Sequence, residues 1–176
     1  GSLGEGATVA YGEKLRAIER LAAELAGAAP LVPAVSSLST AEAVRYVEDA
    51  ERAGASGFMV LPPYVYASDW REMRAHVAAV LAATDKPCML YNNPLAYVTD
   101  FLPEHVAELH AEFPHMNAVK ESSADVRRVT ALRALMPDSF TVLIGVDDLV
   151  VEAVTAGARG WIAGLVNAFP AESVRL

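Results

Sequence analysis

Residues 87–93 read PCMLYNN and residues 117–123 read NAVKESS. In each stretch a short apolar run ends in polar side chains, without the alternation typical of a half-exposed strand. Near-continuous apolar character is typical of a parallel strand, because helices cover a parallel sheet on both faces. The two stretches therefore predict buried parallel strands, each followed by a polar loop.

Four further apolar runs of strand length flank these two. The six predicted strands are 31–35, 57–61, 87–91, 117–119, 141–144 and 161–165. Segments of helical period lie at 12–25, 43–53, 70–83, 103–112, 124–135 and 148–156. Most of them begin with a capping residue, a proline or an acid; for example, Ser39 precedes Glu42 at the start of one helix and Gly54 ends it. The repeat of strand, loop and helix is typical of βα units.

This order of elements is compatible with an open doubly wound sheet or with a barrel. A dinucleotide-binding sheet has a glycine-rich turn after a strand, whereas the only such segment, 157–160, precedes its predicted strand. Polar residues instead follow several strand ends, at 91–93, 120–123 and 147–148. That distribution is expected at the catalytic face of a TIM barrel. We therefore predict an α/β protein with the (β/α)8 TIM-barrel fold.

A complete barrel of this kind needs eight βα units and about 250 residues, whereas the sequence has 176 residues. We expect residues 1–176 to form a partial TIM-barrel domain that covers strand 3 to strand 8 and the loop after strand 2. The first two strands and any C-terminal helices are then expected to be absent. If 176 residues were the whole chain, the open strand edges would predict an inactive fragment or an assembly module.

Composition disfavours several kinds of partner. The 14 Lys and Arg against 22 Asp and Glu give a net charge of -8, which repels nucleic acid. The sequence lacks the uninterrupted apolar run of about 18 residues that predicts a spanning helix, and it shows no signal peptide. We therefore expect a cytoplasmic protein that binds neither nucleic acid nor membranes.

Metal binding is not expected. Cys88 is the only cysteine, and no His or Cys is spaced as in a metal cluster. Cys88 lies within an apolar run and is interpreted as a small buried hydrophobic residue. Asp147 and Asp148 could form a metal pair, but a strand end that leads into a helix favours a capping role.

Lys120 ends the apolar run at 117–119, and would lie at the mouth of the predicted barrel. Desolvation there disfavours a charged ammonium, and an uncharged amine can attack a carbonyl to form a Schiff base. Position alone is also compatible with an ion pair to Glu121 or to another carboxylate nearby. Tyr91 ends the preceding strand, and neighbouring strands lie about 4.8 Å apart, so its phenol could relay a proton beside Lys120. A lone tyrosine at a strand end is also typical of a core residue.

Six motifs, taken in register, resemble those of the dihydrodipicolinate synthase and N-acetylneuraminate lyase family. They are GSLGE at 1–5, LPPY at 61–64, YNNP at 91–94, VKES at 119–122, GVD at 145–147 and GARGWI at 157–162. The resemblance covers nearly the whole chain. It implies a (β/α)8 barrel, usually in a homotetramer, that handles pyruvate or another 2-oxo acid through a lysine Schiff base, without metal or organic cofactor.

The resemblance also implies roles for individual residues. Lys120 is the Schiff-base lysine, Tyr91 shuttles protons at the imine, and Ser2 joins that relay and helps to hold the pyruvate carboxylate. Leu3 donates to the same carboxylate through its backbone, while Ile162 and Ala163 line the opposite wall of the substrate site. A protonated imine withdraws electrons and stabilises the adjacent carbanion, as aldol cleavage, aldol addition and dehydration all require.

Three positions depart from the family pattern. Leu3 replaces a second hydroxyl residue, and Val65 replaces a relay tyrosine that Tyr64 or Tyr66 could substitute. Ala96 stands where the synthase has an arginine that grips the carboxylate of its aldehyde substrate, and a methyl group cannot do so.

These departures lead us to expect a lyase other than the synthase of lysine biosynthesis. Synthase-like activity and deamination of a hydroxylated pyrroline carboxylate remain alternatives, as does a non-enzymatic module that binds a 2-oxo acid.

Overall fold

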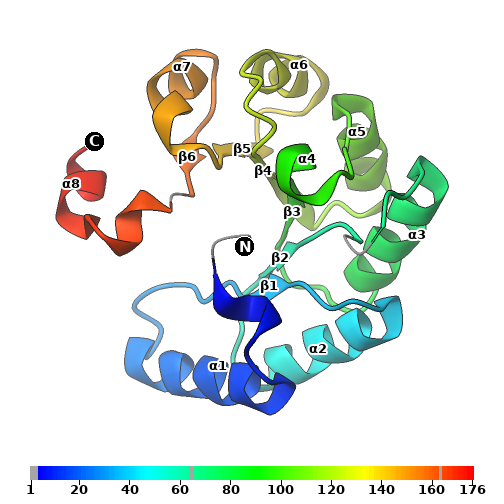
Figure 1. Ribbon diagram of the computed structural model, residues 1–176, viewed down its shortest axis with the longest axis vertical. Helices are drawn as coiled ribbons and strands as arrows, with labels where there is room; N and C mark the ends of the chain where they lie inside the picture. Colours follow the sequence, from blue (N-terminus) through cyan, green and yellow to red (C-terminus); the bar gives the residue numbers. More distant parts are fainter. Residues whose placement is uncertain (1–3, 64–65, 163) are drawn as a thin grey trace.

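The computed structural model describes residues 4–63, 66–162 and 164–176. Within these ranges six strands form one parallel sheet, and they pair in chain order. The strands are β1 Ala34–Val35, β2 Phe58–Val60, β3 Cys88–Asn92, β4 Met116–Glu121, β5 Thr141–Ile144 and β6 Gly160–Trp161. Figure 1 shows the curved sheet inside an incomplete ring of helices, which opens between the two ends of the chain. The α/β prediction of consecutive βα units is confirmed.

Helices follow the strands along the chain. The α-helices are α1 Tyr11–Leu25, α2 Thr40–Arg52, α3 Trp70–Leu81, α4 Pro94–Tyr97, α5 Pro103–Glu112, α6 Arg127–Leu135, α7 Val150–Thr155 and α8 Pro170–Arg175. Three 3-10 helices are η1 Glu5–Ala7, η2 Asp147–Leu149 and η3 Leu165–Asn167. The predicted hydroxyl cap of α2 is present, since Ser39 Oγ accepts a hydrogen bond from the Glu42 backbone N–H. No helix in the described ranges is long and apolar enough to cross a membrane.

The two faces of the sheet carry different clusters of side chains. Phe58, Val60 and Leu90 belong to the main core, which also includes buried residues of the surrounding helices. Met59 and Tyr91, each one residue away from a member of that core, belong to a smaller cluster on the inner face. This division follows from the alternation of side chains along a strand, and it places every second residue of β3 and β4 inside the curve of the sheet.

The register between β3 and β4 positions the site. Tyr91 is paired with Lys120, and Asn92 with Glu121. Since paired residues of parallel strands point to the same side, Tyr91 and Lys120 share the inner face. Asn92 and Glu121 share the outer face, against the helices.

Both terminal strands of the sheet are shorter than predicted. Pro33 has no N–H to donate, so β1 begins only at Ala34, although the carbonyl of Pro33 still accepts from the N–H of Met59. The strand predicted at 161–165 is wrong beyond Trp161. Ile162 still donates its N–H to the carbonyl of Ile144, but residues 165–167 form η3 in place of a strand, and Asp147 accepts hydrogen bonds from the N–H groups of Gly164 and Leu165.

Two predicted helices differ from the prediction at their N-terminal ends. The helix predicted from residue 124 begins at Arg127, because Ala124 has a left-handed backbone with φ of 64°. The helix predicted at 148–156 is divided into the 3-10 turn η2 and the shorter α7.

Candidate active site

A cavity of about 980 Å³ opens where the strands of the sheet end. It is lined by residues from β2, β3 and β4, from the loops after β3, β5 and β6, and from the segment before η1. Its lining residues include Gly4, Tyr91, Asn93, Ala96, Lys120, Ser122, Gly145, Asp147, Ile162 and Asn167. Polar groups from successive parallel strands thus converge on one end of the sheet, where TIM-barrel enzymes have their active sites.

Lys120 and Tyr91 face each other in this cavity. Lys120 is 8% exposed and Tyr91 2% exposed, and the Nζ atom of Lys120 lies 4.2 Å from the centroid of the Tyr91 ring. A cation over the face of an aromatic ring is stabilised by the ring quadrupole. The arrangement therefore suits an ammonium group and equally a protonated imine at the same nitrogen.

The Tyr91 side chain contacts residues of the loop and helix that follow β3. Asn93 Nδ2 donates a hydrogen bond to Tyr91 Oη at 2.9 Å, and the Tyr97 ring packs edge-on against the Tyr91 ring. Asn93 is itself fixed because its Oδ1 accepts from the N–H of Ala96, which caps α4. The phenolic oxygen thus has a defined place beside the lysine, as a proton relay requires.

Ser122 and Gly145 complete the surroundings of the lysine, although neither was assigned a role of its own from the sequence. Ser122 is 3% exposed and lines the cavity, and in the described part of the chain its Oγ is a buried side-chain atom without a hydrogen-bond partner. A Cβ on Gly145 would stand 2.0 Å from Ser122 Oγ and 2.5 Å from Lys120 Cε. The glycine therefore permits the close approach of β5 to the lysine.

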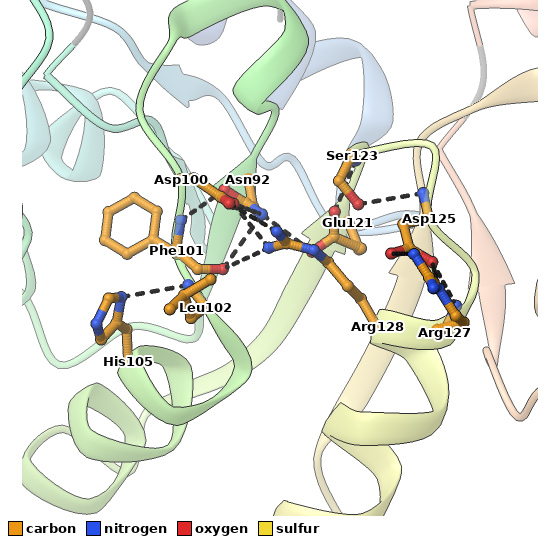
Figure 2. Close-up of polar contacts among 10 residues, drawn as sticks. All are labelled: Asn92, Asp100, Phe101, Leu102, His105, Glu121, Ser123, Asp125, Arg127 and Arg128. Atoms are coloured by element: carbon orange, nitrogen blue, oxygen red, sulfur yellow. Dashed lines mark hydrogen bonds and ion pairs between the residues drawn. The ribbon is translucent and has the colours of Figure 1, made fainter.

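Glu121 does not pair with Lys120, so the predicted ion pair between these two residues is wrong. Its carboxylate lies on the outer side of β4, where it accepts hydrogen bonds from Asn92 Nδ2 at 3.0 Å and from the Ser123 N–H at 2.7 Å (Figure 2). Burial raises the pKa of the Glu121 carboxyl above its ordinary value, although these hydrogen bonds and nearby Arg128 act in the opposite direction.

Four of the seven predicted site residues lie on the cavity wall: Tyr91, Ala96, Lys120 and Ile162. The other three, Ser2, Leu3 and Ala163, lie outside the described residues, as do Tyr64 and Val65. The described neighbours Gly4, Glu5 and Gly164 also line the cavity. Tyr66, a suggested substitute for the missing relay tyrosine, is half exposed.

Asp147 organises the loop after β6. Its carboxylate accepts hydrogen bonds from Trp161 Nε1 at 3.1 Å and from the N–H groups of Gly164 at 3.1 Å and Leu165 at 3.0 Å. The predicted side-chain cap is not seen at either η2 or α7. This loop carries Ile162, so Asp147 shapes one wall of the cavity through contacts that lie far apart in sequence.

Two other candidate chemistries, a metal site and a cysteine nucleophile, receive no support. Across the described ranges, no three His, Cys, Asp or Glu side chains are grouped so as to hold a metal ion. Cys88 is buried, and desolvation raises the pKa of its thiol to about 12, which makes it a poor nucleophile at neutral pH.

Comparison with known proteins gives a consistent result at the level of family and fold. The model of the dihydrodipicolinate synthetase family matches residues 1–176. The 4-hydroxy-tetrahydrodipicolinate synthase of Bacillus subtilis (strain 168) is 32% identical over 163 residues, which cover 93% of this chain and 56% of the relative. The synthase of Pseudoalteromonas atlantica is 34% identical over 170 residues, which cover 97% of this chain and 58% of the relative.

Solved structures share the fold. The 4-hydroxy-tetrahydrodipicolinate synthase of Methylacidiphilum fumariolicum SolV superposes with a TM-score of 0.92 at 29% identity, over 97% of this chain and 57% of the other. The dihydrodipicolinate synthase of Aquifex aeolicus does so with a TM-score of 0.92 at 28% identity, over 99% of this chain and 60% of the other. The predicted partial TIM barrel is confirmed, and the chain spans less than two thirds of the length of these relatives.

Proposed function

The chain belongs to the dihydrodipicolinate synthetase family, and on that premise we propose that the protein is a class I lyase that binds pyruvate or another 2-oxo acid as a Schiff base of Lys120. The observation that carries this proposal is the position of the largely buried Lys120, whose Nζ lies over the ring of Tyr91 in a cavity at the ends of parallel strands. A solvated lysine in a surface ion pair would not have this environment.

The proposed reaction begins with attack of the Lys120 amine on the C2 carbonyl of the 2-oxo acid. Water leaves, and a protonated imine forms at Nζ, with Tyr91 as the relay for the protons that the two steps exchange. Either the C3–H bond then loses its proton to the Tyr91 relay, or the C3–C4 bond breaks and C4 leaves as the carbonyl carbon of an aldehyde, its hydroxyl proton passing to the same relay. In both cases the electrons of the broken bond flow into the imine and give an enamine. The enamine can add to an aldehyde, or it can be the product of carbon–carbon cleavage.

Other parts of the site are assigned by resemblance. Ser2 would join the proton relay and hold the substrate carboxylate, together with the backbone at Leu3. Ile162 and Ala163 would form the opposite wall of the site. We further propose that residues 1–176 supply six of the eight βα units of the barrel, and that the protein is a cytoplasmic homo-oligomer, either a dimer or a tetramer.

Borohydride reduction with pyruvate tests the Schiff base. We expect one reduced pyruvate per chain, on the tryptic peptide that contains Lys120, as measured by intact and peptide mass spectrometry. The Lys120→Ala variant should remain unlabelled, and Lys86→Arg, which alters another of the three lysines, should label like the wild type. A folded wild-type protein that stays unlabelled would favour a module that binds 2-oxo acids without turning them over.

A finer proposal concerns the second substrate. Ala96 lines the cavity at the position where the synthase resemblance expects an arginine, and the described lining residues include Glu5 and Asp147 but no arginine. A carboxylate on the aldehyde would therefore lack a bidentate partner here and would meet negative charges. The curated relatives are named as synthases, so this proposal rests on the composition of the cavity alone.

The cavity favours a hydroxylated or uncharged aldehyde partner, and a lyase other than the synthase. Deamination of a hydroxylated pyrroline carboxylate is the second candidate. Turnover of pyruvate with matched aldehydes, with and without a carboxylate, decides between the first candidate and synthase activity. We expect Ala96→Arg to shift the preference towards the carboxylated aldehyde, whereas a wild-type preference for that aldehyde would indicate synthase activity.

A further inference from the structure

Asn92 and Glu121 form a buried polar pair on the outer face of the sheet. Asn92 is 0% exposed and Glu121 2% exposed, and Asn92 Nδ2 donates to Glu121 Oε2 at 3.0 Å. The two residues are also paired in the register of β3 and β4. This hydrogen bond therefore ties the two strands together next to the point where Tyr91 and Lys120 face each other on the inner side.

The asparagine is fixed by the segment before α5 as well. Its Oδ1 accepts from the N–H of Phe101 at 2.9 Å, and its Nδ2 also lies 3.2 Å from Asp100 Oδ1 and 3.3 Å from the Phe101 carbonyl oxygen. Figure 2 shows these contacts converging on the carboxamide. Rotation of the Asn92 amide would place its oxygen against the Asp100 and Phe101 oxygens, so its orientation is determined.

Helix α6 is linked to the same group. Arg128 Nη1 and Nη2 donate to the two carboxylate oxygens of Asp100 at 2.7 and 2.6 Å, in the bidentate geometry that is strongest for this pair. In the described part of the chain, this network brings two charged side chains close to Asn92 and Glu121, namely those of Asp100 and Arg128. The pair is thus connected to β3, β4, α6 and the segment before α5.

Each member of the pair adjoins a residue of the proposed chemistry. Asn92 follows Tyr91 on β3 and Glu121 follows Lys120 on β4, and side chains alternate between the two faces of a strand. A shift of Asn92 relative to Glu121 therefore moves the Tyr91 ring relative to the Lys120 amine.

We propose that Asn92 and Glu121 are positioning residues, which hold Tyr91 and Lys120 in the geometry that Schiff-base formation needs. The inference rests on the proposed function, since it concerns the rate of the same reaction. Misplacement of a catalytic group by about 1 Å can cost about a hundredfold in rate. Neither residue touches the substrate cavity, so their effect is exerted through the two strands.

The hydrogen-bond pattern makes an isosteric substitution informative. Both oxygens of Glu121 accept hydrogen bonds, one from Asn92 and one from the Ser123 N–H. In Glu121→Gln, the amide nitrogen must face one of these two donors, whichever way it is turned. The variant therefore keeps the volume of the side chain but breaks one bond of the pair or displaces a strand.

The test compares Glu121→Gln with the wild type in borohydride trapping with pyruvate, at temperatures where circular dichroism shows both proteins folded. We expect the trapping rate at saturating pyruvate to fall about tenfold to a hundredfold. We expect the half-saturating pyruvate concentration to change far less. Asp125→Asn is the matched control, because the Asp125–Arg127 pair lies nearby on the surface but does not bind Asn92 or Glu121 (Figure 2). It should trap pyruvate at the wild-type rate.

A purely structural role would lower the stability of Glu121→Gln and leave the rate per folded molecule unchanged, and that result would overturn the inference. If Glu121→Gln does not fold, Arg128→Lys replaces it, since lysine keeps the charge but cannot bind Asp100 through a planar fork. Its saturated rate should then fall about threefold or more, and a wild-type rate would equally overturn the inference. Absence of any adduct in the wild-type protein would refute the proposed function instead.

Discussion

Gly145 lies so close to Lys120 that a Cβ at this position would stand 2.5 Å from the Cε atom of the lysine. The same Cβ would stand 2.0 Å from the hydroxyl oxygen of Ser122. Gly145 follows β5 and donates its N–H to the carbonyl of Glu121, so the backbone itself fixes this approach. The space for the lysine side chain on its strand is therefore set by a residue of the neighbouring strand end.

Gly145→Ala should displace the Lys120 side chain. Overpacking of this kind costs about 1–3 kcal/mol in stability, and we expect pyruvate trapping to slow by about tenfold or more because the amine moves from its place over Tyr91. Gly12→Ala is the matched control, since Gly12 is exposed in α1 and its Cβ would meet only ordinary contacts. Trapping kinetics and urea unfolding measure both effects. Wild-type trapping by a folded Gly145→Ala protein would contradict the argument.

Tyr91→Phe separates the ring from the hydroxyl. The ring under Lys120 remains, but Asn93 loses the oxygen to which it donates, so we expect a loss of only about 0.5–1.5 kcal/mol in stability. Removal of a proton relay should slow exchange of the pyruvate methyl protons with solvent by about a hundredfold or more. Proton NMR in heavy water measures this exchange. Tyr46→Phe, which alters a buried tyrosine of α2, is the control and should exchange normally. An unchanged rate in Tyr91→Phe would assign the relay to another group.

Asp147→Asn should loosen the loop after β6. The Asp147 carboxylate accepts hydrogen bonds from three N–H donors. The amide of asparagine has only one oxygen, so at least one of these donors loses its acceptor, and the free energy of unfolding should fall by about 1–3 kcal/mol. Because Ile162 in this loop lines the cavity, the half-saturating pyruvate concentration should rise. Urea unfolding followed by Trp161 fluorescence measures the first effect and trapping kinetics the second. Asp148→Asn, which alters the exposed neighbouring residue, should change neither the stability nor the half-saturating pyruvate concentration. Equal stability of the two variants would count against the role of Asp147.

The central part of the fold could be predicted from the sequence because its signals are local. The strand at 141–144 and the helix at 103–112 have the predicted bounds, since an apolar run or an opening proline marks each of them. The end of β6 could not be predicted, because the contacts that turn the backbone away come from Asp147, 17 and 18 residues earlier. Helix α4 is a single turn, too short for periodicity, although Asn93 and Pro94 carry the cap signal.

The part of the site that lies on the strands could be predicted from the sequence, because side chains alternate between the two faces of a strand. Tyr91 and Lys120 are each the last residue but one of neighbouring strands, and the observed register places them opposite each other. Ser122 lies two residues beyond Lys120, so the same alternation could have found it. Gly145 could not be found in this way, because its importance depends on how closely β5 approaches β4, which the sequence pattern does not specify.

His76 links stability to pH away from the proposed active site. It is buried in α3, its Nδ1 lies 2.9 Å from Thr40 Oγ1, and burial lowers its pKa below the ordinary value of 6.5. In the unfolded chain the His76 imidazole therefore takes up a proton near pH 6.5, whereas in the native protein it does so only at lower pH. Since the unfolded state then holds more protons, the free energy of unfolding falls as the pH drops below 6.5.

His76→Gln removes this titration and retains a side chain that can hydrogen-bond with Thr40. We expect it to unfold with a shallower dependence on pH than the wild type in the range below 6.5, although its stability at neutral pH is lower. Urea titrations at a series of pH values, analysed as the difference between the two proteins, cancel the contribution of the carboxyl groups that both retain. Parallel curves for wild type and variant would mean that His76 has the same proton affinity in the folded and the unfolded chain.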